Sequence, residues 1–371
     1  MLSAEEHRCR LHTRVRSFIE ASARGDAAAE SFDGLGLAVL RYQADHVAAY
    51  QRLLARAGRD PGRVSEVRVL PAVPSDAFRF ARIAAHPPAD DVALFRTSGT
   101  TALPRGEHAL STTETYECSA LAWGGWALFC DIHEPLTAII LSPRENPESS
   151  LHFMMKTFAA RFAPKAHYLQ TSDLSAIDAD ELERACDAAA RAGAPAIVMG
   201  TSFAFVHALD ALGGRRLQLP QASRAMHTGG FKGRSRAVDA RELRGHIAQT
   251  FGVSEGAVVG EYGMTELSSQ LYEGTLRGQR GFDTPSATHG TFIPPPWMRV
   301  AAVDPETLLP LADGEVGILR FEDLANVDGA LAIQTADRGR CTSAGVELMG
   351  RSPGAPPRGC SLALEDLLEN G

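Results

Sequence analysis

Apolar residues recur along the first 60 positions at a spacing that predicts helices. Between residues 37 and 54 they repeat about every 3.6 positions, as on one face of a helix; they are Leu37, Leu40, Ala44, Val47, Tyr50 and Leu54. Gly58 then interrupts the pattern. Two prolines follow in VLPAVPSDAFR, and this segment is expected to be extended because proline restricts its own backbone and that of the preceding residue.

Beyond residue 90 the pattern changes to short apolar runs, each of which stands before a polar, glycine-bearing loop. The runs cover residues 92–95, 137–141, 196–200 and 257–260. Helix-like stretches lie between them, at 178–193 and 236–252. Buried strands that alternate with helices predict an α/β fold with a largely parallel sheet.

From residue 291 the pattern is that of a small β-rich subdomain, because two strand-like runs flank a turn-rich loop. A segment rich in proline and glycine and one short helix follow. We therefore expect four parts: a helical N-terminal part of a large domain at 1–90, an α/β core at 91–290, the β-rich subdomain at 291–348, and a hinge with a short terminal segment at 349–371.

Composition narrows the class of protein. The chain has 371 residues, of which 44% are hydrophobic, enough for two or three domain-sized units. Its formal net charge of −8 argues against a nucleic-acid binder, which is expected to be basic. The six cysteines form no C-x-x-C motif, and the N-terminus has no apolar signal core. Because no apolar run reaches 18 residues, we expect no transmembrane helix and a cytoplasmic protein.

The stretch RTSGTTALPRG, residues 96–106, follows an apolar run and is rich in small hydroxyl side chains. In open α/β sheets, ligands gather at the carboxyl ends of strands. Backbone N–H groups and Ser/Thr hydroxyls of such a loop can surround a phosphate, and Arg105 could add charge-assisted bonds. The stretch lacks the G-K-[ST] of a Walker A loop. A Ser/Thr-rich surface loop explains it equally well.

Paired glycines in HTGGFKGR, residues 227–234, would let a flat ring approach the backbone, with Lys232 and Arg234 available for an anion. An ordinary strand-to-helix turn is the preferred interpretation of this stretch alone. In IQTADRGR, residues 333–340, Asp337 could bind ribose hydroxyls, unless the stretch is a plain β-turn.

The stretch GEYGMTE, residues 260–266, combines an aromatic ring, a glycine, a hydroxyl and a carboxylate at the end of a predicted strand. Tyr262 could stack on a base, Thr265 could donate to a phosphate, and Glu266 could hold Mg²⁺, which prefers oxygen ligands. Thr265 could also be the N-cap of a helix, with Glu266 favouring the helix dipole.

Together and in this order, these stretches resemble the signatures of the adenylate-forming enzymes, the superfamily of acyl- and aryl-CoA ligases and luciferases. The matching stretches are T-S-G-T-T-A-L-P-R-G at 97–106, G-G at 229–230, Y-G-M-T-E at 262–266, T-A-D at 335–337 and G-R at 350–351. The resemblance spans about residues 90–360 and implies a large N-terminal domain of parallel and mixed sheets with helices, followed by a small β-rich subdomain. Two positions depart from the pattern: Ala102 replaces glycine, and Arg105 replaces lysine, which keeps the charge but not the shape.

The resemblance also implies a reaction, in which a carboxylate attacks the α-phosphate of ATP, with Mg²⁺, to give acyl-AMP and pyrophosphate. The ATP-binding residues that it implies are Thr97, Ser98, Gly99, Thr100, Thr101, Arg105, Gly229, Gly230, Tyr262, Gly263, Met264, Thr265 and Asp337. The hydroxyl loop would hold the β- and γ-phosphates, the paired glycines and Tyr262 the adenine, Thr265 the α-phosphate and Asp337 the ribose. Glu266 would bind Mg²⁺, and Arg351 would assist near the hinge.

The C-terminal part of the chain resembles a smaller group within this superfamily. Full members of the superfamily continue with another small domain, whereas 20 residues follow Arg351, so we expect a truncated C-terminal domain. This layout, with VLPAVPSDAFR, ESSLHFMM, TGGFKGRSR and RGCSL, resembles the acyl-protein synthetases of LuxE type. In that group a cysteine near the C-terminus accepts the acyl group and passes it to a reductase partner. Cys360 is the cysteine at the matching place.

Cys360 also suits this role chemically. Ser361 would be the N-cap of a terminal helix, which would place Cys360 between Arg358 and the positive end of the helix dipole. Both favour the thiolate, the form that attacks an acyl-AMP carbonyl. On chemistry alone, a small buried residue is the more common role of a free cysteine. The resemblance reverses that preference for Cys360, and we expect the other cysteines in the core.

The sequence leaves three functions open. The leading hypothesis is a synthetase that activates a carboxylic acid, in particular a fatty acid, and acylates its own Cys360. The second is an adenylating enzyme whose acceptor is CoA, an amine or a carrier protein, and the third is a nucleotide-binding protein without catalysis. We expect the acyl pocket between 142–158 and 199–206, with walls that could equally be core residues: Phe153, Met154, Met155, Phe203 and Phe205.

Overall fold

Three helices open the chain in the computed structural model, which describes residues 2–98, 104–169, 177–229 and 239–351. They are α1 (Ala4–Arg24), α2 (Phe32–His46) and α3 (Ala48–Arg56). The Ser3 hydroxyl accepts from the Glu6 N–H, and the Glu6 carboxylate accepts from the Ser3 N–H, so a capping box starts α1. The periodic stretch at 37–54 is two helices rather than one, because Val47 has an extended backbone (φ −103°, ψ 97°) between α2 and α3.

Five parallel strands form the centre of the molecule, in the order β5-β4-β6-β7-β8. They are β4 (Thr137–Leu141), β5 (Lys165–Tyr168), β6 (Ala196–Thr201), β7 (Arg224–Thr228) and β8 (Val258–Tyr262). The helices around them are α4 (Glu114–Leu128), α5 (Ser150–Phe162), α6 (Ala179–Ala192), α7 (Ser202–Leu212) and α8 (Ala240–Phe251). The strands expected at 137–141, 196–200 and 257–260 are therefore confirmed, as is the helix at 178–193.

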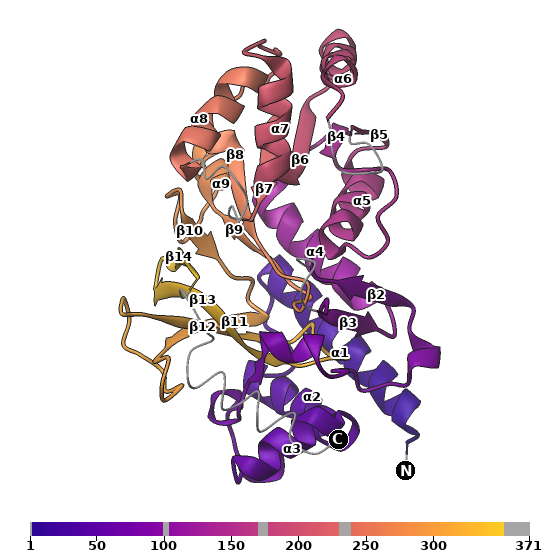
Figure 1. Ribbon diagram of the computed structural model, residues 1–371, viewed down its shortest axis with the longest axis vertical. Coiled ribbons are helices and arrows are strands. Elements are labelled where there is room, and N and C mark those ends of the chain that lie inside the picture. The colour runs from indigo at the N-terminus through magenta and orange to yellow at the C-terminus, as the bar shows by residue number, and fades with distance from the viewer. Residues whose placement is uncertain (1, 99–103, 170–176, 230–238, 352–371) are drawn as a thin grey trace.

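Both faces of the parallel sheet are covered, because successive strand residues point to opposite faces. Ile139 packs with α6, α7 and α8, whereas Ile140 packs in the cluster that contains α4 and α5. In Figure 1, α6, α7 and α8 lie together at one end of the molecule, and α2 and α3 lie at the other. Side chains buried on both faces explain why these strands are continuous apolar runs in the sequence.

The same sheet continues into the β-rich part of the chain. Strand β8 pairs antiparallel with β9 (Leu271–Glu273), which pairs with β10 (Thr291–Ile293) and so reaches β14 (Gly345–Arg351). Beyond it lie β13 (Ala332–Thr342), β12 (Val316–Asp323) and β11 (Met298–Val303), all antiparallel. The two strands expected on either side of a turn-rich loop are β11 and β12. With β1 (Val73–Pro74), which pairs with β13, the described sheet has 12 strands.

Short helices complete the described fold. One is the α-helix α9 (Thr275–Gln279), and the others are 3₁₀ turns: η1 (Pro61–Arg63), η2 (Val67–Val69), η3 (Ser75–Arg79), η4 (Pro88–Asp90) and η5 (Glu255–Ala257). Among the residues that the structure describes, no helix is long and apolar enough to cross a membrane.

The apolar run at 92–95 does not belong to this sheet. It overlaps β2 (Ala93–Arg96), which pairs antiparallel with β3 (Glu107–Leu110) in a separate hairpin. The expectation of a buried parallel strand is therefore wrong: Phe95 is buried, whereas Val92 is 66% exposed. Phe95 accounts for the apolar signal, because its ring packs 5.6 Å from Tyr116 and 5.5 Å from Phe153.

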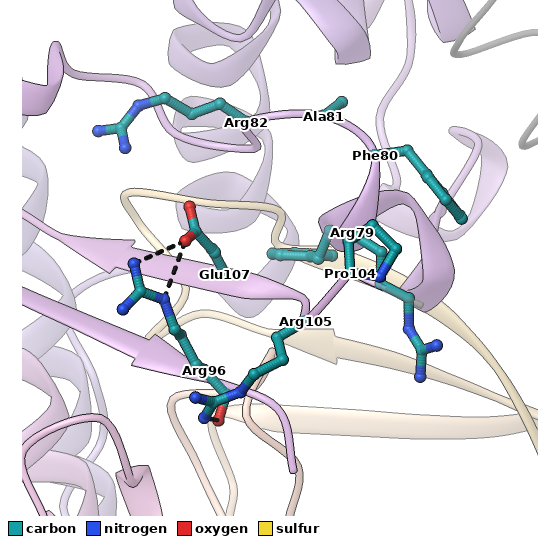
Figure 2. Close-up of a pocket in the computed structure, with 9 residues that line it drawn as sticks. Arg79, Phe80, Ala81, Arg82, Arg96, Pro104, Arg105 and Glu107 are labelled. Carbon is teal, nitrogen blue, oxygen red and sulfur yellow. Dashed lines mark hydrogen bonds and ion pairs between the residues drawn. The ribbon is translucent and has the colours of Figure 1, made fainter. Parts of the chain in front are cut away.

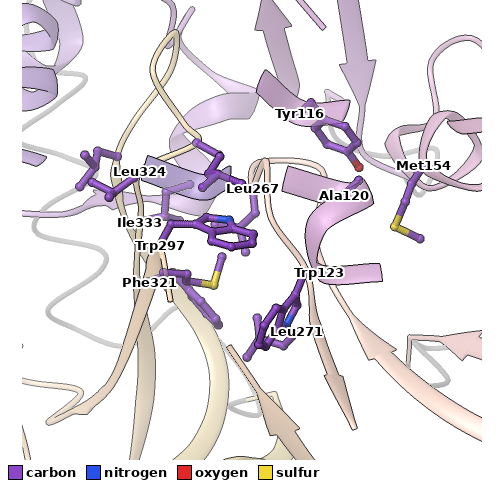
Figure 3. Close-up of a cluster of buried hydrophobic side chains, with 14 of the residues drawn as sticks. Tyr116, Ala120, Trp123, Met154, Leu267, Leu271, Trp297, Phe321, Leu324 and Ile333 are labelled. Carbon is purple, nitrogen blue, oxygen red and sulfur yellow. The ribbon is translucent and has the colours of Figure 1, made fainter. Parts of the chain in front are cut away.

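A large apolar cluster lies between the helices and the antiparallel strands. Figure 3 shows Trp297 in this cluster near Phe321 and Leu267. The Trp297 ring is fully buried, and its Nε1 donates to the hydroxyls of Ser119 (3.0 Å) and Ser269 (3.1 Å). The cluster therefore also packs behind the loop that follows β8.

The connection between β12 and β13, residues 324–331, is buried along its whole length. Its polar groups bond to distant helices. Asp328 accepts from His12 Nε2 of α1 (3.1 Å) and from the Ser111 N–H (2.8 Å), and Gln43 of α2 donates to the carbonyls of Asn326 and Val327. This buried connection thus joins the N-terminal helices to the centre of the molecule.

Candidate nucleotide-binding site

Residues from three of the predicted motifs meet at one carboxylate. The Tyr262 hydroxyl donates to Asp337 Oδ2 at 2.7 Å, and Arg351 Nε donates to Asp337 Oδ1, also at 2.7 Å. We call Tyr262, Asp337 and Arg351 the Asp337 cluster. They come from β8, β13 and β14, and the pairing of Asp337 with Arg351 across β13 and β14 fixes two of them in register.

Tyr262 is held by a second aromatic ring as well as by Asp337. Its ring stacks on Phe321 with centroids 5.7 Å apart and an interplanar angle of 16°. Burial and the neighbouring Asp337 carboxylate raise the pKa of Tyr262, so its hydroxyl keeps its proton and can donate to Asp337. The β-turn interpretation of residues 333–340 is wrong, because this stretch lies inside β13.

The loop after β8 has neither helical nor strand structure between Gly263 and Gln270. The helix cap suggested for Thr265 is therefore wrong. Instead, partners distant in sequence hold the backbone: His108 Nδ1 donates to the Thr265 carbonyl (2.7 Å), and Asn326 Nδ2 donates to the Glu266 carbonyl (3.0 Å). These contacts tie the loop to the hairpin at Thr265 and to the connection between β12 and β13 at Glu266.

The hairpin carries the ends of the predicted phosphate loop. Gly99, Thr100, Thr101 and Ala102 lie outside the described residues, and Ser98 is exposed beside them. The Thr97 hydroxyl accepts from the Gly106 N–H at 2.9 Å, and the Thr97 N–H donates to the Gly106 carbonyl at 3.0 Å. These two bonds close the base of the loop.

Arg105, the predicted phosphate ligand, is engaged by protein groups in this structure. It donates to the Thr97 carbonyl (2.7 Å) and to Glu148 (2.6 Å). Glu148 also pairs with Arg96, and these two arginines lower the pKa of its carboxyl. A phosphate at Arg105 would have to compete with Glu148.

A cavity of about 590 Å³ opens beside this hairpin, lined in part by Arg79, Arg82, Arg96 and Arg105 (Figure 2). Its arginines point in different directions and are paired with carboxylates: Arg82 with Asp91 (2.6 Å), and Arg96 with Glu107 (2.9 Å). The cavity is therefore polar, but its cationic charge is largely neutralised.

The 3₁₀ turn η3 lies between the hairpin and the Asp337 cluster. A Cβ added at Gly106 would lie 3.5 Å from Phe78 and 3.6 Å from Arg79 of this turn. On the other side, burial lowers the pKa of Arg351, but the Asp337 carboxylate and, to a smaller extent, Asp76 of this turn raise it above its usual value. The structure thus brings the first motif and the last two motifs to either side of one short turn.

Gly229 directly follows β7 and lies in the left-handed region (φ 79°), which glycine adopts without strain, whereas Gly230 lies outside the described residues. The Ser202 hydroxyl donates to the Gly229 carbonyl at 2.7 Å and accepts from His227 Nδ1 at 3.1 Å. Burial lowers the pKa of His227 to about 4, so its ring is neutral at pH 7. Ser202 and His227 were not predicted; only contacts across the sheet reveal them.

Glu261 was quoted in a motif but given no role. It precedes Tyr262 on β8 and points to the opposite face, where it is 5% exposed and bonded to Thr228. Burial raises the pKa of Glu261 to about 7. A carboxyl that is half protonated near neutral pH therefore lies one residue from the Asp337 cluster.

The chain matches a known family over most of its length. The sequence pattern of the family described as "Acyl-protein synthetase, LuxE" matches residues 26–369. The chain belongs to this family. Among curated relatives of this LuxE-family protein is the long-chain-fatty-acid–luciferin-component ligase of Aliivibrio fischeri, 32% identical over 84 residues; that segment is 20% of this chain and 22% of the relative.

Solved structures show the fold of the LuxE-family protein to be that of adenylate-forming enzymes. A 2-hydroxyisobutyryl-CoA ligase in complex with 2-HIB-AMP superposes with a TM-score of 0.60 and 14% identity, covering 86% of this chain and 67% of that one. ATP-bound MatB from Rhodopseudomonas palustris gives a TM-score of 0.50 at 17% identity, covering 80% of this chain and 52% of that one. The LuxE-family protein therefore spans about half the length of MatB.

The cysteines of the LuxE-family protein differ in accessibility. Cys360 lies outside the described residues, as do Arg358 and Ser361. Burial raises the pKa of the thiols of Cys118 and Cys341 to about 11 and of Cys186 to about 12, and it also raises that of Cys130. The expectation that the other cysteines lie in the core is wrong for Cys9, which is exposed on α1.

The residues suggested for an acyl pocket do not share one wall. Met154 and Met155 of α5 are buried in the cluster on one face of the sheet, with Phe153 packed against it. Phe205 of α7 is buried in the cluster on the opposite face. Phe203 lies 4.2 Å from His207 of the same helix. A single pocket could therefore combine the α5 residues, but not these residues with Phe205.

Proposed function

We propose that this protein activates a carboxylic acid with ATP and then carries the acyl group on its own Cys360. The Asp337 cluster is the observation that carries this proposal. Two residues that the adenylate-forming pattern assigns to the nucleotide, Tyr262 and Asp337, and a third that it assigns to the hinge, Arg351, are joined by two 2.7 Å hydrogen bonds, although the first and the last are 89 positions apart. Membership in a family described as acyl-protein synthetases supports the second step.

In this proposal the described motif residues surround ATP. Asp337 binds the ribose hydroxyls, Tyr262 and Gly229 lie against the adenine, and Thr265 contacts the α-phosphate. Thr97 and Ser98 begin the loop that holds the outer phosphates. Arg105 binds them after leaving Glu148, which costs little because both side chains are about 40% exposed.

Mg²⁺ suits the chemistry of the carboxylate of Glu266. Glu266 is 7% exposed, in the loop beside Thr265, and Mg²⁺ is commonly held by one or two carboxylates together with substrate phosphates and water. When bound, the ion neutralises charge on the departing pyrophosphate. Glu266 would be its protein ligand, and the hydroxyl of Thr265 would stay with the nucleotide.

The chemistry then proceeds in two displacements. A carboxylate oxygen of the acid attacks the α-phosphorus, and the bond to the pyrophosphate oxygen breaks. The Cys360 thiolate next attacks the carbonyl carbon of the acyl-AMP, AMP leaves, and a thioester forms. The acyl group passes from Cys360 to a partner such as a reductase. The name of the Aliivibrio fischeri relative favours a long-chain fatty acid as substrate.

Intact mass spectrometry tests both steps. We expect the protein, incubated with ATP, Mg²⁺ and a panel of fatty and aromatic acids, to gain the mass of one acyl group in a hydroxylamine-sensitive bond. Cys360→Ser should lose this gain but keep acid-dependent exchange of pyrophosphate into ATP. Cys9→Ser, which removes an exposed thiol, is the matched control and should still be acylated.

Other outcomes separate the alternatives. Pyrophosphate exchange without any mass gain, together with thioester formation on added CoA, would favour an adenylating enzyme with an external acceptor. ATP binding without exchange over the whole panel would favour a nucleotide-binding protein without catalysis. Acylation that persists in Cys360→Ser would refute the assignment of that cysteine.

A further inference from the structure

His108 is a fully buried residue of β3 that no motif singles out. Its Nδ1 lies 2.7 Å from the carbonyl oxygen of Thr265. A carbonyl can only accept, so Nδ1 must carry the hydrogen and Nε2 the lone pair. Burial lowers the pKa of His108, which agrees with a neutral ring. The bond therefore defines the tautomer of this histidine.

The other ring nitrogen of His108 has no hydrogen-bond partner among the described residues. An unpaired polar atom in a protein interior costs stability, whereas an apolar side chain of similar size would not incur that cost. Among the described residues, the bond from Nδ1 to the Thr265 carbonyl is thus the hydrogen bond that the His108 ring makes. Packing alone gives no reason for an imidazole at this position.

The peptide that His108 holds belongs to a loop that is supported from several sides; at its far end, Trp297 donates to the Ser269 hydroxyl. Asn326 donates to the Glu266 carbonyl, and Asp323 Oδ2 accepts from the Ser268 N–H at 3.1 Å. Both come from the end of β12 and the buried connection behind it. Only His108 ties the loop to the hairpin, among the bonds that the described residues show for the Thr265 and Glu266 carbonyls.

We propose that His108 is a positioning residue for the nucleotide site. By fixing the Thr265 carbonyl, it orients the peptide between Thr265 and Glu266, so that the hydroxyl and the carboxylate face the phosphates and Mg²⁺. His108 also lies two residues after Gly106, so the bond sets the distance between the two phosphate-binding segments. This inference rests on the proposed function and adds a residue to it.

The test compares two substitutions with a matched control. His108→Leu removes the donor, whereas His108→Asn places an amide N–H close to the position of Nδ1–H. His86→Leu is the control, because His86 is also buried, with one nitrogen bonded to Asp91 (2.9 Å) and the other 3.7 Å from Asp328, beyond hydrogen-bond distance. Thermal unfolding of all variants measures the cost to the fold.

The first readout is binding of ATP by calorimetry, with and without Mg²⁺. We expect Mg²⁺ to lower the Kd for ATP in the unmodified protein by a factor that we call the Mg²⁺ gain. In His108→Leu this factor should be about tenfold smaller, which is the effect of losing one hydrogen bond. His108→Asn and His86→Leu should keep the gain. The second readout is pyrophosphate exchange, where His108→Leu should lower kcat while the KM for the carboxylic acid is unchanged.

Three results would overturn the proposal: an unaltered Mg²⁺ gain in folded His108→Leu, no recovery in folded His108→Asn, or an equal loss in His86→Leu. Failure of the proposed function is distinguishable from these. If the unmodified protein binds ATP with a Mg²⁺ gain but catalyses no exchange, the activity is wrong, and the binding comparison still decides the role of His108. If it binds no ATP, both proposals are refuted.

Discussion

Glu261 gives a direct test of how burial controls charge beside the Asp337 cluster. The carboxyl is 5% exposed, and within the described residues it bonds to Thr228 but has no ion-pair partner. Burial raises its pKa from 4.5 to about 7. Glu261→Gln replaces it with a neutral amide of nearly the same shape, so the substitution removes the charge without opening a cavity.

The sign and size of the effect follow from linkage. Between pH 4.5 and about 7 the folded protein retains a proton on Glu261 that the unfolded chain has lost, so the free energy of unfolding falls as pH rises. Above that range both states are ionised and the loss is constant. A pKa difference of this size corresponds to a loss of about 3 kcal/mol in the free energy of unfolding of the parent protein. As pH rises from 4.5 to 8, the stability of Glu261→Gln relative to the parent should therefore increase by about that amount.

Urea unfolding monitored by the fluorescence of the three tryptophans, at pH values from 4.5 to 8.5, measures this difference. Other buried groups titrate in the same range: burial lowers the pKa of His227 to about 4 and raises that of Asp323 to about 6. Both are present in the two proteins, so they cancel when the variant is compared with the parent. A stability difference that does not change with pH would refute the reasoning, because Glu261 would then be ionised throughout.

Two further predictions concern the nucleotide site and the fold. Asp337→Asn removes the negative charge to which Tyr262 and Arg351 both donate. It should raise the KM for ATP in pyrophosphate exchange by about tenfold, since hydrogen bonds to a charged group are worth roughly 1.5–3 kcal/mol. An unchanged KM would contradict a ribose contact. Gly274→Ala should lower the free energy of unfolding by about 1–3 kcal/mol, because its Cβ would lie 2.2 Å from the Ser286 carbonyl oxygen, and a Tm equal to that of the parent would contradict this. Gly125→Ala, in α4 with no atom within 4 Å of the added Cβ, is its control and should be neutral or stabilising.

The sequence predicted the parallel strands well because burial on both faces leaves a simple signal. The run at 137–141 contains five consecutive buried residues in the structure. The run at 92–95 gives a similar signal for a different reason, since Phe95 alone of its side chains is deeply buried. A short apolar run cannot distinguish these two cases, because it does not specify which strands will pair.

Errors elsewhere trace to partners far away in the chain. Thr265 and Glu266 suit a helix cap locally, but the loop is held by His108, 157 residues before Thr265, and by Asn326, 60 residues after Glu266. Local preference is a weak guide when tertiary contacts satisfy the backbone instead.

For the candidate site, the motif pattern named Tyr262, Asp337 and Arg351, and the structure places them in contact. Their roles toward a ligand, and that of Cys360, stay predictions. Glu261 and His108 could not be identified from the pattern, because what sets them apart is burial and unpaired atoms rather than residue type or spacing.

The buried connection between β12 and β13 bears on how the chain can be shortened. Removal of the first 60 residues would take away His12 and Gln43, and so leave Asp328 and the carbonyl of Asn326 without those partners in the interior. Uncompensated buried polar groups are among the most destabilising defects a protein can carry. A fragment beginning after the N-terminal helices should therefore fail as an independent folding unit, even though it keeps every motif predicted to bind the nucleotide. Limited proteolysis should release the helices only after global unfolding.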